Sequence, residues 1–358
     1  MAREIFKPDI ENPKLKPVVC SLCGRVHRRP IMEGVYVIQE AYCDALIPVN
    51  IIGGFLGAGK TTFLNYILGQ PATERRDILI REYGEAAIDD QLLKNVEGKV
   101  HVFPGVSVHD DPQLVLHDYL HGLVSGDVPR PFDRLLLETS GIDTPESLLT
   151  LFMLGYMPDH YRLGSLIVIV DAEYGGLDIE EYEVAAEQVA YADIVIINKT
   201  DLAGRYTVDA LEALVKSING MAKVERASYA KVSLDGIMDI ALYDQLKVLE
   251  PNEGAEAMND IRTYTLVEKR PMDKAKVNAW TDRLFKMEGP KLLRCKGFFN
   301  FSGEDYRYEF QAVRKSFHSK ADRKWKDGEE RKSTVVIIGE NLPDEKKLRE
   351  EFAACAAD

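Results

Sequence analysis

The sequence predicts an α/β fold, in which a doubly wound, mostly parallel sheet is followed by a smaller α+β domain. From Pro48 onward, short runs of β-branched residues alternate with helical patterns, an order typical of parallel sheets. The runs are nearly continuous in apolar residues, as expected for strands that helices cover on both faces. After residue 260 the alternation is replaced by four strand patterns around one helical pattern, which indicates a separate α+β unit.

Each strand of the first domain is predicted from a buried run, and each helix from apolar residues at helical spacing. The predicted strands lie at 49–52, 77–80, 99–103, 133–137, 165–170, 193–197 and 224–227. The predicted helices begin near residue 62, at 112–124 and at 208–219. In the second domain, strands are predicted at 262–268, 293–301, 306–313 and 334–338, and a helix at 273–285.

Length and local composition divide the chain into parts. A chain of 358 residues is longer than one hydrophobic core usually supports, which favours two domains. An acidic stretch containing Pro251 and Gly254 has the composition of a linker. We expect an N-terminal extension with a C-x-x-C pattern at 1–47, a first domain at 48–249, a linker at 250–260 and a second domain at 261–358.

The charge and the short apolar stretches limit the partners that we expect. A net charge of −13 disfavours broad attraction to nucleic acid or anionic lipid. The first 13 residues carry three acidic residues and lack the apolar core of a secretory signal. The longest apolar stretches are too short or too rich in glycine for a membrane-spanning helix. We therefore expect a cytoplasmic protein without a nucleic-acid or membrane partner.

A glycine-rich motif joins the first strand of the sheet to the first helix and fits the P-loop pattern G-x-x-x-x-G-K-[ST]. The motif and the start of the helix supply Gly54, Gly57, Ala58, Gly59, Lys60, Thr61 and Thr62. The glycines let backbone N–H groups converge on phosphates, Lys60 reaches the β- and γ-phosphates, and the Thr61 hydroxyl can bind Mg²⁺. The sequence therefore predicts a P-loop nucleotide site with bound Mg²⁺.

The strand at 133–137 ends in a second predicted part of this site. Glu138 follows the strand, and Gly141 lies three residues further on. In P-loop proteins an acidic residue at this place holds Mg²⁺ and a glycine senses the γ-phosphate. Phosphoryl transfer depends mainly on positioning and charge neutralisation, so we expect Lys60, Mg²⁺ on Thr61 and the P-loop amides to supply most of the catalysis, with Glu138 as the carboxylate on the metal side.

The strand at 193–197 leads into a third motif, which predicts the base. Asn198, Lys199 and Asp201 match the guanine-recognition pattern N-K-x-D. Asp201 would accept hydrogen bonds from guanine N1–H and the exocyclic amine, donors that adenine lacks. Adenine would leave the carboxylate unpaired, which discriminates by about 10⁴-fold or more. The predicted nucleotide is therefore GTP, and residues 228–231 would close over the base.

Together these motifs resemble the CobW-like branch of the P-loop GTPases, which includes HypB and UreG. In the first domain the resemblance is carried by residues 53–62, 82–85, 88–89, 138–141, 170–172, 187–188, 192–193 and 198–201. In the second domain, residues 294–298 and 334–339 are similar to landmarks of the CobW C-terminal domain.

The resemblance implies slow, Mg²⁺-dependent GTP hydrolysis that delivers a metal or metallocofactor, such as zinc or cobalt in a corrinoid, to a client protein. The client would be a metalloprotein or a corrinoid protein. The candidates for orienting the attacking water are Glu82 or Asp89, in the switch-like segment, or a residue of a partner subunit. Because related P-loop GTPases often dimerise on GTP, a GTP-dependent homodimer is a further expectation.

One segment departs from the family pattern. The family usually carries G-C-x-C-C after the third strand, whereas residues 105–109 of this chain read GVSVH. Valine does not bind transition metals as a thiolate does, so the usual cargo site is in question. The alternative function is a nucleotide-dependent regulatory switch that binds a client and carries no metal.

Two other groups of residues are candidate zinc ligands. His117 and His121 stand four residues apart on the predicted helix, with His109 near its start, although solvated surface histidines explain the same pattern. The extension has the pattern C-x-x-C, with a histidine and a third cysteine available to complete four ligands. These residues are Cys20, Cys23, His27 and Cys43. A structural zinc site and simple burial of the thiols both remain open there.

Overall fold

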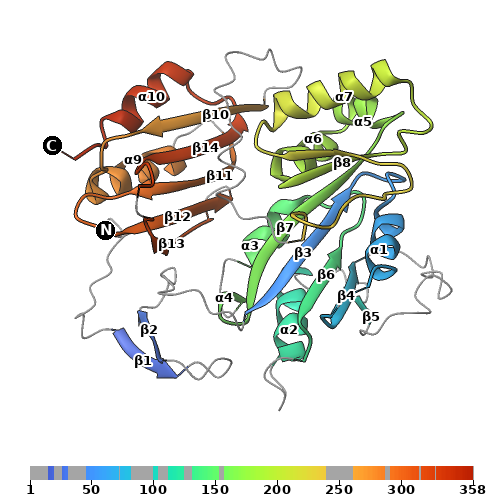
Figure 1. Cartoon of the computed structure of the whole chain (residues 1–358), viewed down its shortest axis with the longest axis horizontal. Helices are drawn as coiled ribbons and strands as arrows, with labels where there is room; N and C mark the ends of the chain where they lie inside the picture. Colours follow the sequence, from blue (N-terminus) through green and yellow to red (C-terminus); the bar gives the residue numbers. More distant parts are fainter. Residues whose placement is uncertain are drawn as a thin grey trace. The chain divides into compact units, whose positions relative to one another are not determined.

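The computed structural model describes the chain as segments of two compact units (Figure 1). One unit comprises residues 45–248 and 254–259, and the other comprises residues 1–44, 249–253 and 260–358. The described residues are 15–19, 26–30, 46–71, 73–81, 100–103, 112–124, 131–152, 157–238, 261–286, 291–313, 316–326 and 328–357.

The first unit is built on a parallel sheet, with seven strands among its described residues. Its strands are β3 (Ile47–Gly54), β4 (Arg76–Arg81), β5 (Val100–Phe103), β6 (Arg134–Glu138), β7 (Tyr161–Asp171), β8 (Ile194–Asn198) and β9 (Lys223–Arg226). They lie side by side in the order β5-β4-β6-β3-β7-β8-β9, and every neighbouring pair is parallel. This arrangement confirms the predicted doubly wound sheet.

Helices cover this sheet on both faces. They are α1 (Lys60–Leu68), α2 (Pro112–Val124), α3 (Pro145–Leu151), α4 (Met157–His160), α5 (Gly175–Glu181), α6 (Glu183–Tyr191) and α7 (Arg205–Ile218). From β3 the chain crosses to β4 in one direction along the sheet, and from β7 it crosses to β8 in the other. Right-handed crossovers therefore place α1 on one face and α5 and α6 on the opposite face. The crevice at the carboxyl ends of β3 and β7 is a topological switch point, where ligands bind in such sheets.

The face under α1 is also covered by the segment that follows β9. Ala230, Val232 and Ile237 share a buried cluster with Phe63 and Leu64 of α1. Val232 is tied to α1 through its carbonyl oxygen, which accepts a hydrogen bond from the Tyr66 hydroxyl at 2.7 Å. The sequence analysis assigned no packing role to this segment, because its residues show no helical or strand periodicity.

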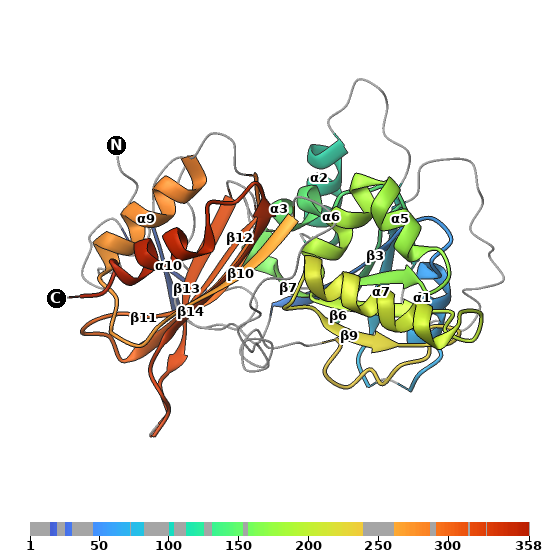
Figure 2. The same ribbon diagram turned by 90° about the horizontal axis from the view of Figure 1, so that it is seen from above.

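The second unit contains a five-stranded antiparallel sheet with two helices on one face (Figure 2). The strands are β10 (Ile261–Glu268), β11 (Lys291–Asn300), β12 (Tyr306–Val313), β13 (Ser316–Lys324) and β14 (Ser333–Glu340), and the helices are α9 (Lys274–Lys286) and α10 (Glu345–Ala353). The sheet order is β10-β14-β11-β12-β13. Trp280 of α9 and Phe352 of α10 pack into a core with Phe299 and Phe310 of the sheet. The predicted α+β class of this unit is confirmed.

Two elements of the second unit were not predicted. The strand β13 reads SFHSKADRK, which is too polar for a buried run, and it forms the edge of the sheet beside β12 alone. Charged side chains on an edge strand discourage pairing with other chains. The helix α10 buries only Leu348 and Phe352, four residues apart, so its apolar signal is weak.

The N-terminal residues contain a pair of strands that the sequence analysis did not expect. β1 (Leu15–Val19) pairs antiparallel with β2 (Val26–Pro30), and Val19 lies opposite Val26. The residues between these strands lie outside the described part of the chain. Among the described residues of the whole chain, no helix has the length and apolar character needed to cross a membrane.

Candidate nucleotide site

The predicted phosphate loop joins β3 to α1 in a conformation that requires glycine at two positions. Gly54 has φ 139° and Gly59 has φ 107°, values that other residues rarely adopt. A Cβ atom at Gly54 would lie 2.3 Å from the Ile169 carbonyl oxygen, and one at Gly59 would lie 2.5 Å from the Asn198 side-chain nitrogen. The neighbouring strands β7 and β8 therefore hold the loop closely, which fixes the direction of its backbone N–H groups.

The side chain of Lys60 lies within this loop. Its Nζ donates hydrogen bonds to the carbonyl oxygens of Gly54, at 2.9 Å, and Phe55, at 3.2 Å. The ammonium charge is thus held beside the backbone that the motif uses for phosphate. This is the placement expected of a side chain that binds the β- and γ-phosphates.

Thr61 and Glu138, the two predicted magnesium ligands, meet directly. The Thr61 hydroxyl donates a hydrogen bond to Glu138 Oε1 at 2.8 Å. The parallel pairing of β3 with β6 sets Glu138 opposite Ile52, two residues before the phosphate loop begins at Gly54. A hydroxyl and a carboxylate are hard oxygen donors, the kind that Mg²⁺ prefers. The pair therefore fits a magnesium ion.

Asn198, at the end of β8, braces the loops around the site. Its Nδ2 donates to the Ala58 carbonyl oxygen at 3.0 Å, and its Oδ1 accepts from the Ala230 N–H at 2.7 Å. The side chain thereby ties the phosphate loop to the segment after β9. Its amide is engaged by the protein on both sides, which gives Asn198 a bracing role in addition to its place in the N-K-x-D motif.

The other two members of that motif differ in exposure. Lys199 has φ 62°, and its Nζ forms an ion pair with Asp171 Oδ2 at 2.6 Å. Asp201 is exposed beyond the end of β8. Asp171 ends β7, and sequence reasoning assigned it no role although residues 170–172 carried part of the family resemblance. By pairing with Lys199 it fixes the lysine stem, which the motif uses to cover a base.

The loop that follows Glu138 packs on the phosphate loop and on α6. A Cβ atom at Gly141 would lie 2.6 Å from Leu56 Cδ2 and 2.8 Å from the Leu56 backbone nitrogen. From α6, the buried Gln188 donates side-chain hydrogen bonds to the carbonyl oxygens of Gly141, at 3.2 Å, and Asp143, at 3.0 Å. The structure thus brings Gln188 to the site, a residue that sequence reasoning quoted without a role.

The carboxylate of Asp143 lies on the same loop beside two cations. Its Oδ2 accepts a hydrogen bond from the Ser140 N–H at 3.1 Å and lies 3.8 Å from Arg81 Nε. Burial raises the pKa of Asp143, while the charges of Arg81 and Lys60 oppose that rise. Arg81 and Asp143 were both missed from the sequence, because neither belongs to a nucleotide-binding motif.

Two family descriptions match the chain, and together they span most of its length. Residues 48–226 match the nucleotide-binding domain of CobW/HypB/UreG proteins. The chain belongs to the CobW/HypB/UreG family. Residues 261–356 match the C-terminal domain of the cobalamin synthesis protein CobW. The resemblance predicted from the sequence is confirmed, and the chain is a P-loop GTPase of the CobW family.

Individual relatives of the CobW family support this assignment over nearly the whole chain. The zinc chaperone YjiA of Escherichia coli is 31% identical over 317 residues, which cover 86% of this chain and 98% of YjiA. The zinc chaperone CobW of Pseudomonas aeruginosa is 26% identical, over 92% of this chain and 96% of its own. A crystal structure of Zn(II)-bound YjiA superimposes with a TM-score of 0.65 at 29% identity, covering 87% of this chain and 99% of YjiA.

Several candidate residues of this CobW family member lie outside the described residues. They are Glu82, Cys20, Cys23, Cys43 and His109, together with the rest of the departing segment 105–109. His27 lies in β2, and only its backbone is described. The water-orienting role of Glu82 and the cysteine site of the extension therefore stay predictions.

The helix α2 carries the two remaining histidine candidates, which contact different neighbours. His117 Nδ1 lies 3.2 Å from the carboxylate of the adjacent Asp118. His121 lies edge-on to His160 of α4, with 6.2 Å between ring centroids. Within the described residues, these histidines do not form a group of three metal-ligating side chains.

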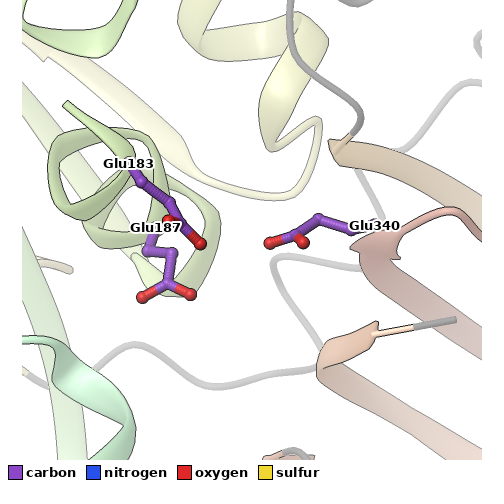
Figure 3. A group of neighbouring side chains, drawn as sticks. All are labelled: Glu183, Glu187 and Glu340. Atoms are coloured by element: carbon purple, nitrogen blue, oxygen red, sulfur yellow. The ribbon is translucent and has the colours of Figure 1, made fainter. Parts of the chain in front are cut away.

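The helix α6 carries two acidic side chains, one at its first residue and one a turn later. Figure 3 shows Glu183 and Glu187 one turn apart on this helix, and Glu340, drawn in the same figure, ends β14 of the other unit. Glu183 lies in the first turn of α6, where a negative charge complements the helix dipole. Glu183 therefore supports the start of the helix that presents Gln188.

Proposed function

We propose that this protein uses GTP hydrolysis to deliver zinc to a client metalloprotein. The observation that carries the proposal is the similarity to the zinc chaperone YjiA, which extends over 98% of that protein. Because the similarity includes the second unit, it goes beyond the GTPase domain that many unrelated proteins share. The Pseudomonas relative is likewise a zinc chaperone, which favours zinc over cobalt or a corrinoid as cargo.

In this proposal the residues of the nucleotide site divide the chemistry among them. Lys60 binds the β- and γ-phosphates, Thr61 and Glu138 hold Mg²⁺, and Asp201 recognises guanine. Mg²⁺, when bound, neutralises charge that develops on the phosphates during transfer. The 2.8 Å contact between Thr61, at the start of α1, and Glu138, at the end of β6, supports these two residues as the ones that would hold the ion.

The cargo site is proposed to differ from the usual family site. Segment 105–109 offers no thiolate, whereas Cys20, Cys23 and Cys43 of the extension are suited to zinc. Zinc held by these cysteines would be cargo if its binding depends on GTP, and structural if it does not. His117 and His121 are the second candidate set.

The alternative proposal is a nucleotide-dependent switch that recruits a client and carries no metal. The absence of cysteine from 105–109 favours it, because the usual route from switch to cargo is missing there. The two proposals share the GTPase cycle and differ in whether metal binds in proportion to the protein.

Elemental analysis of purified, chelator-washed protein, with and without GTP and Mg²⁺, separates the proposals. The same measurement is made on a Cys20→Ser/Cys23→Ser variant and on a His117→Ala/His121→Ala variant. A Lys60→Ala variant serves as the control in which nucleotide turnover is lost.

Zinc that binds in a GTP-dependent way and is lost in one of the paired variants supports the chaperone and locates its cargo. Nucleotide-independent zinc that is lost with the cysteines indicates a structural site. Protein without metal under every condition overturns the chaperone proposal in favour of the client-binding switch.

A further inference from the structure

The loop after β6 is held from three sides, by the phosphate loop, by α6 and by the end of β4. Gly141 allows this loop to approach the backbone of Leu56 so closely that any side chain would collide with it. Gln188 contacts the loop from α6, and Arg81 contacts it from the end of β4. The position of this loop is therefore fixed by distant parts of the chain.

The amide of Gln188 can face the loop in only one orientation. Its nitrogen lies 3.2 Å from the Gly141 carbonyl oxygen and 3.0 Å from the Asp143 carbonyl oxygen. Both partners accept hydrogen bonds and cannot donate, so the NH₂ group, and not the oxygen, must point at the loop. The residue is 1% exposed, and solvent does not compete for these two bonds.

The oxygen of the same amide makes Gln188 energetically unfavourable at this position. Among the residues that the structure describes, Oε1 is buried without a hydrogen-bond donor. Gln188 also lines a cavity of about 10 Å³ beside Phe55 and Asp178, room for about one water molecule. An apolar side chain of similar size would pack here without an unpaired oxygen, so packing alone does not account for glutamine.

The carboxylate of Asp143 gives the loop a second attachment. Arg81 Nε lies 3.8 Å from Asp143 Oδ2, and the arginine side chain is only 10% exposed. Ile80, the residue before Arg81, pairs with Glu138 across the β4–β6 ladder. Arg81 therefore stands level with the magnesium-side carboxylate, on the side of the site opposite the phosphate loop.

We infer that Gln188 and Arg81 are positioning residues of the GTPase reaction, which hold the loop from Gly141 to Asp143 in place for the γ-phosphate. The inference rests on the assignment of Lys60, Thr61 and Glu138 to the nucleotide site. A loop that is held in place before the nucleotide binds loses less entropy when it contacts the γ-phosphate. GDP lacks that phosphate, so the two residues favour GTP over GDP and speed hydrolysis.

The test compares full-length Gln188→Leu with Asn219→Leu as a matched control. Asn219 is also a buried amide that donates to three carbonyl oxygens, those of Val189, Ala190 and Ala192. These carbonyls lie in the last turn of α6 and at its C-cap, directly after Gln188, so the control removes a buried amide from the same end of the helix without removing a hydrogen bond to the loop. We measure kcat for GTP and the dissociation constants of GDP and of a non-hydrolysable GTP analogue.

Gln188→Leu is expected to lower kcat by about 10-fold and to lower the affinity for the GTP analogue by about 10-fold, since two hydrogen bonds are lost. GDP binding should change by less than about 2-fold, and Asn219→Leu should leave the ratio of the two affinities unchanged. Arg81→Gln should reproduce the selective loss, and Arg81→Lys, which keeps the charge, should restore part of it. These arginine variants test the inference independently of how α6 tolerates leucine.

The Gln188→Glu variant adds a pH readout that a merely structural residue would not show. A carboxylate facing two carbonyl oxygens repels them, whereas a protonated carboxyl can donate one hydrogen bond. The kcat of Gln188→Glu, relative to the parent protein, should therefore rise as the pH falls from about 8 towards 5.5.

Equal losses of GTP-analogue and GDP affinity in Gln188→Leu and Arg81→Gln, or no loss in either, would overturn the inference. Failure of the underlying site assignment looks different, because Lys60→Ala would then retain turnover. The two failures are thus told apart by the Lys60→Ala variant measured in parallel.

Discussion

At the scale of single residues, the phosphate loop is constrained most strongly at Gly54. Its backbone lies in a region that only glycine adopts readily, and the Ile169 carbonyl oxygen occupies the space a side chain would need. Gly57 differs, because it has φ 73° but no atom within 4 Å of an added Cβ. A side chain at Gly54 would therefore meet both backbone strain and a steric collision, whereas a side chain at Gly57 would meet backbone strain alone.

Replacing Gly54 with alanine should destabilise the first unit by about 2–5 kcal/mol, from overpacking and backbone strain together. The matched variant Gly57→Ala should cost about 1–2 kcal/mol, the strain of the left-handed conformation alone. Urea unfolding at equilibrium measures both values. Equal losses in the two variants would contradict the close contact with β7.

Recognition of the guanine base is predicted to depend on Asp201. Asp201→Asn should lower GTP affinity by more than about 10-fold, because the amide places a donor against guanine N1–H and the exocyclic amine. Inosine triphosphate, which lacks that amine, should bind the parent protein more weakly than GTP and lose this disadvantage in the variant. Competition binding measures the preference; an unchanged preference for GTP would remove Asp201 from base recognition.

At the scale of elements, the edge strand β13 depends on polar contacts that could not be predicted from its sequence. Glu329, in the turn after β13, accepts hydrogen bonds from Arg323 at 2.8 Å and 2.7 Å and lies 3.7 Å from Arg307. The hydrogen bonds from Arg323 lower the pKa of Glu329 to about 2. A charged network thus joins the edge strand to β12, in place of apolar burial.

This network predicts a stability that depends on pH. A lowered pKa means that the folded state favours the carboxylate, so the contribution is complete above the ordinary value of 4.5 and is lost as the pH falls towards 2. Glu329→Gln should therefore lower the urea midpoint of the second unit at pH 7, and the gap to the parent protein should narrow below pH 4. If the difference in urea midpoint stays constant down to pH 2.5, the effect of the substitution is due to packing and not to the charge of Glu329.

At the scale of the whole molecule, the nucleotide motifs all lie in one of the two compact units. A ligand stabilises the state that it binds, by about 2.7 kcal/mol at a concentration 100 times its dissociation constant. The second unit has its own hydrophobic core around Trp280 and Phe299, so we expect it to fold without the nucleotide.

Calorimetry should therefore show that GTP with Mg²⁺ raises the unfolding temperature of one transition and leaves a second one in place. The Lys60→Ala variant, which has lost a phosphate contact, should show a smaller shift. A single transition that moves as a whole with nucleotide would mean that the two units unfold together.

Local sequence patterns were sufficient to predict the fold class, the family and the nucleotide motifs. These signals are local, since a P-loop or a buried strand is encoded in a few consecutive residues with fixed spacing. The sequence analysis missed β13 and α10, whose apolar patterns are weak, and it located the segment after β9 without its packing.

The side chains that support the site could be identified only from the folded arrangement of the chain. Asp171, Arg81, Asp143 and Gln188 come from strands, a loop and a helix separated by up to about a hundred residues, and none belongs to a nucleotide-binding motif. Their roles depend on distances such as the 3.0 Å from Gln188 to the Asp143 carbonyl oxygen. Such contacts arise when the sheet order brings distant segments together, and no local spacing in the sequence encodes them.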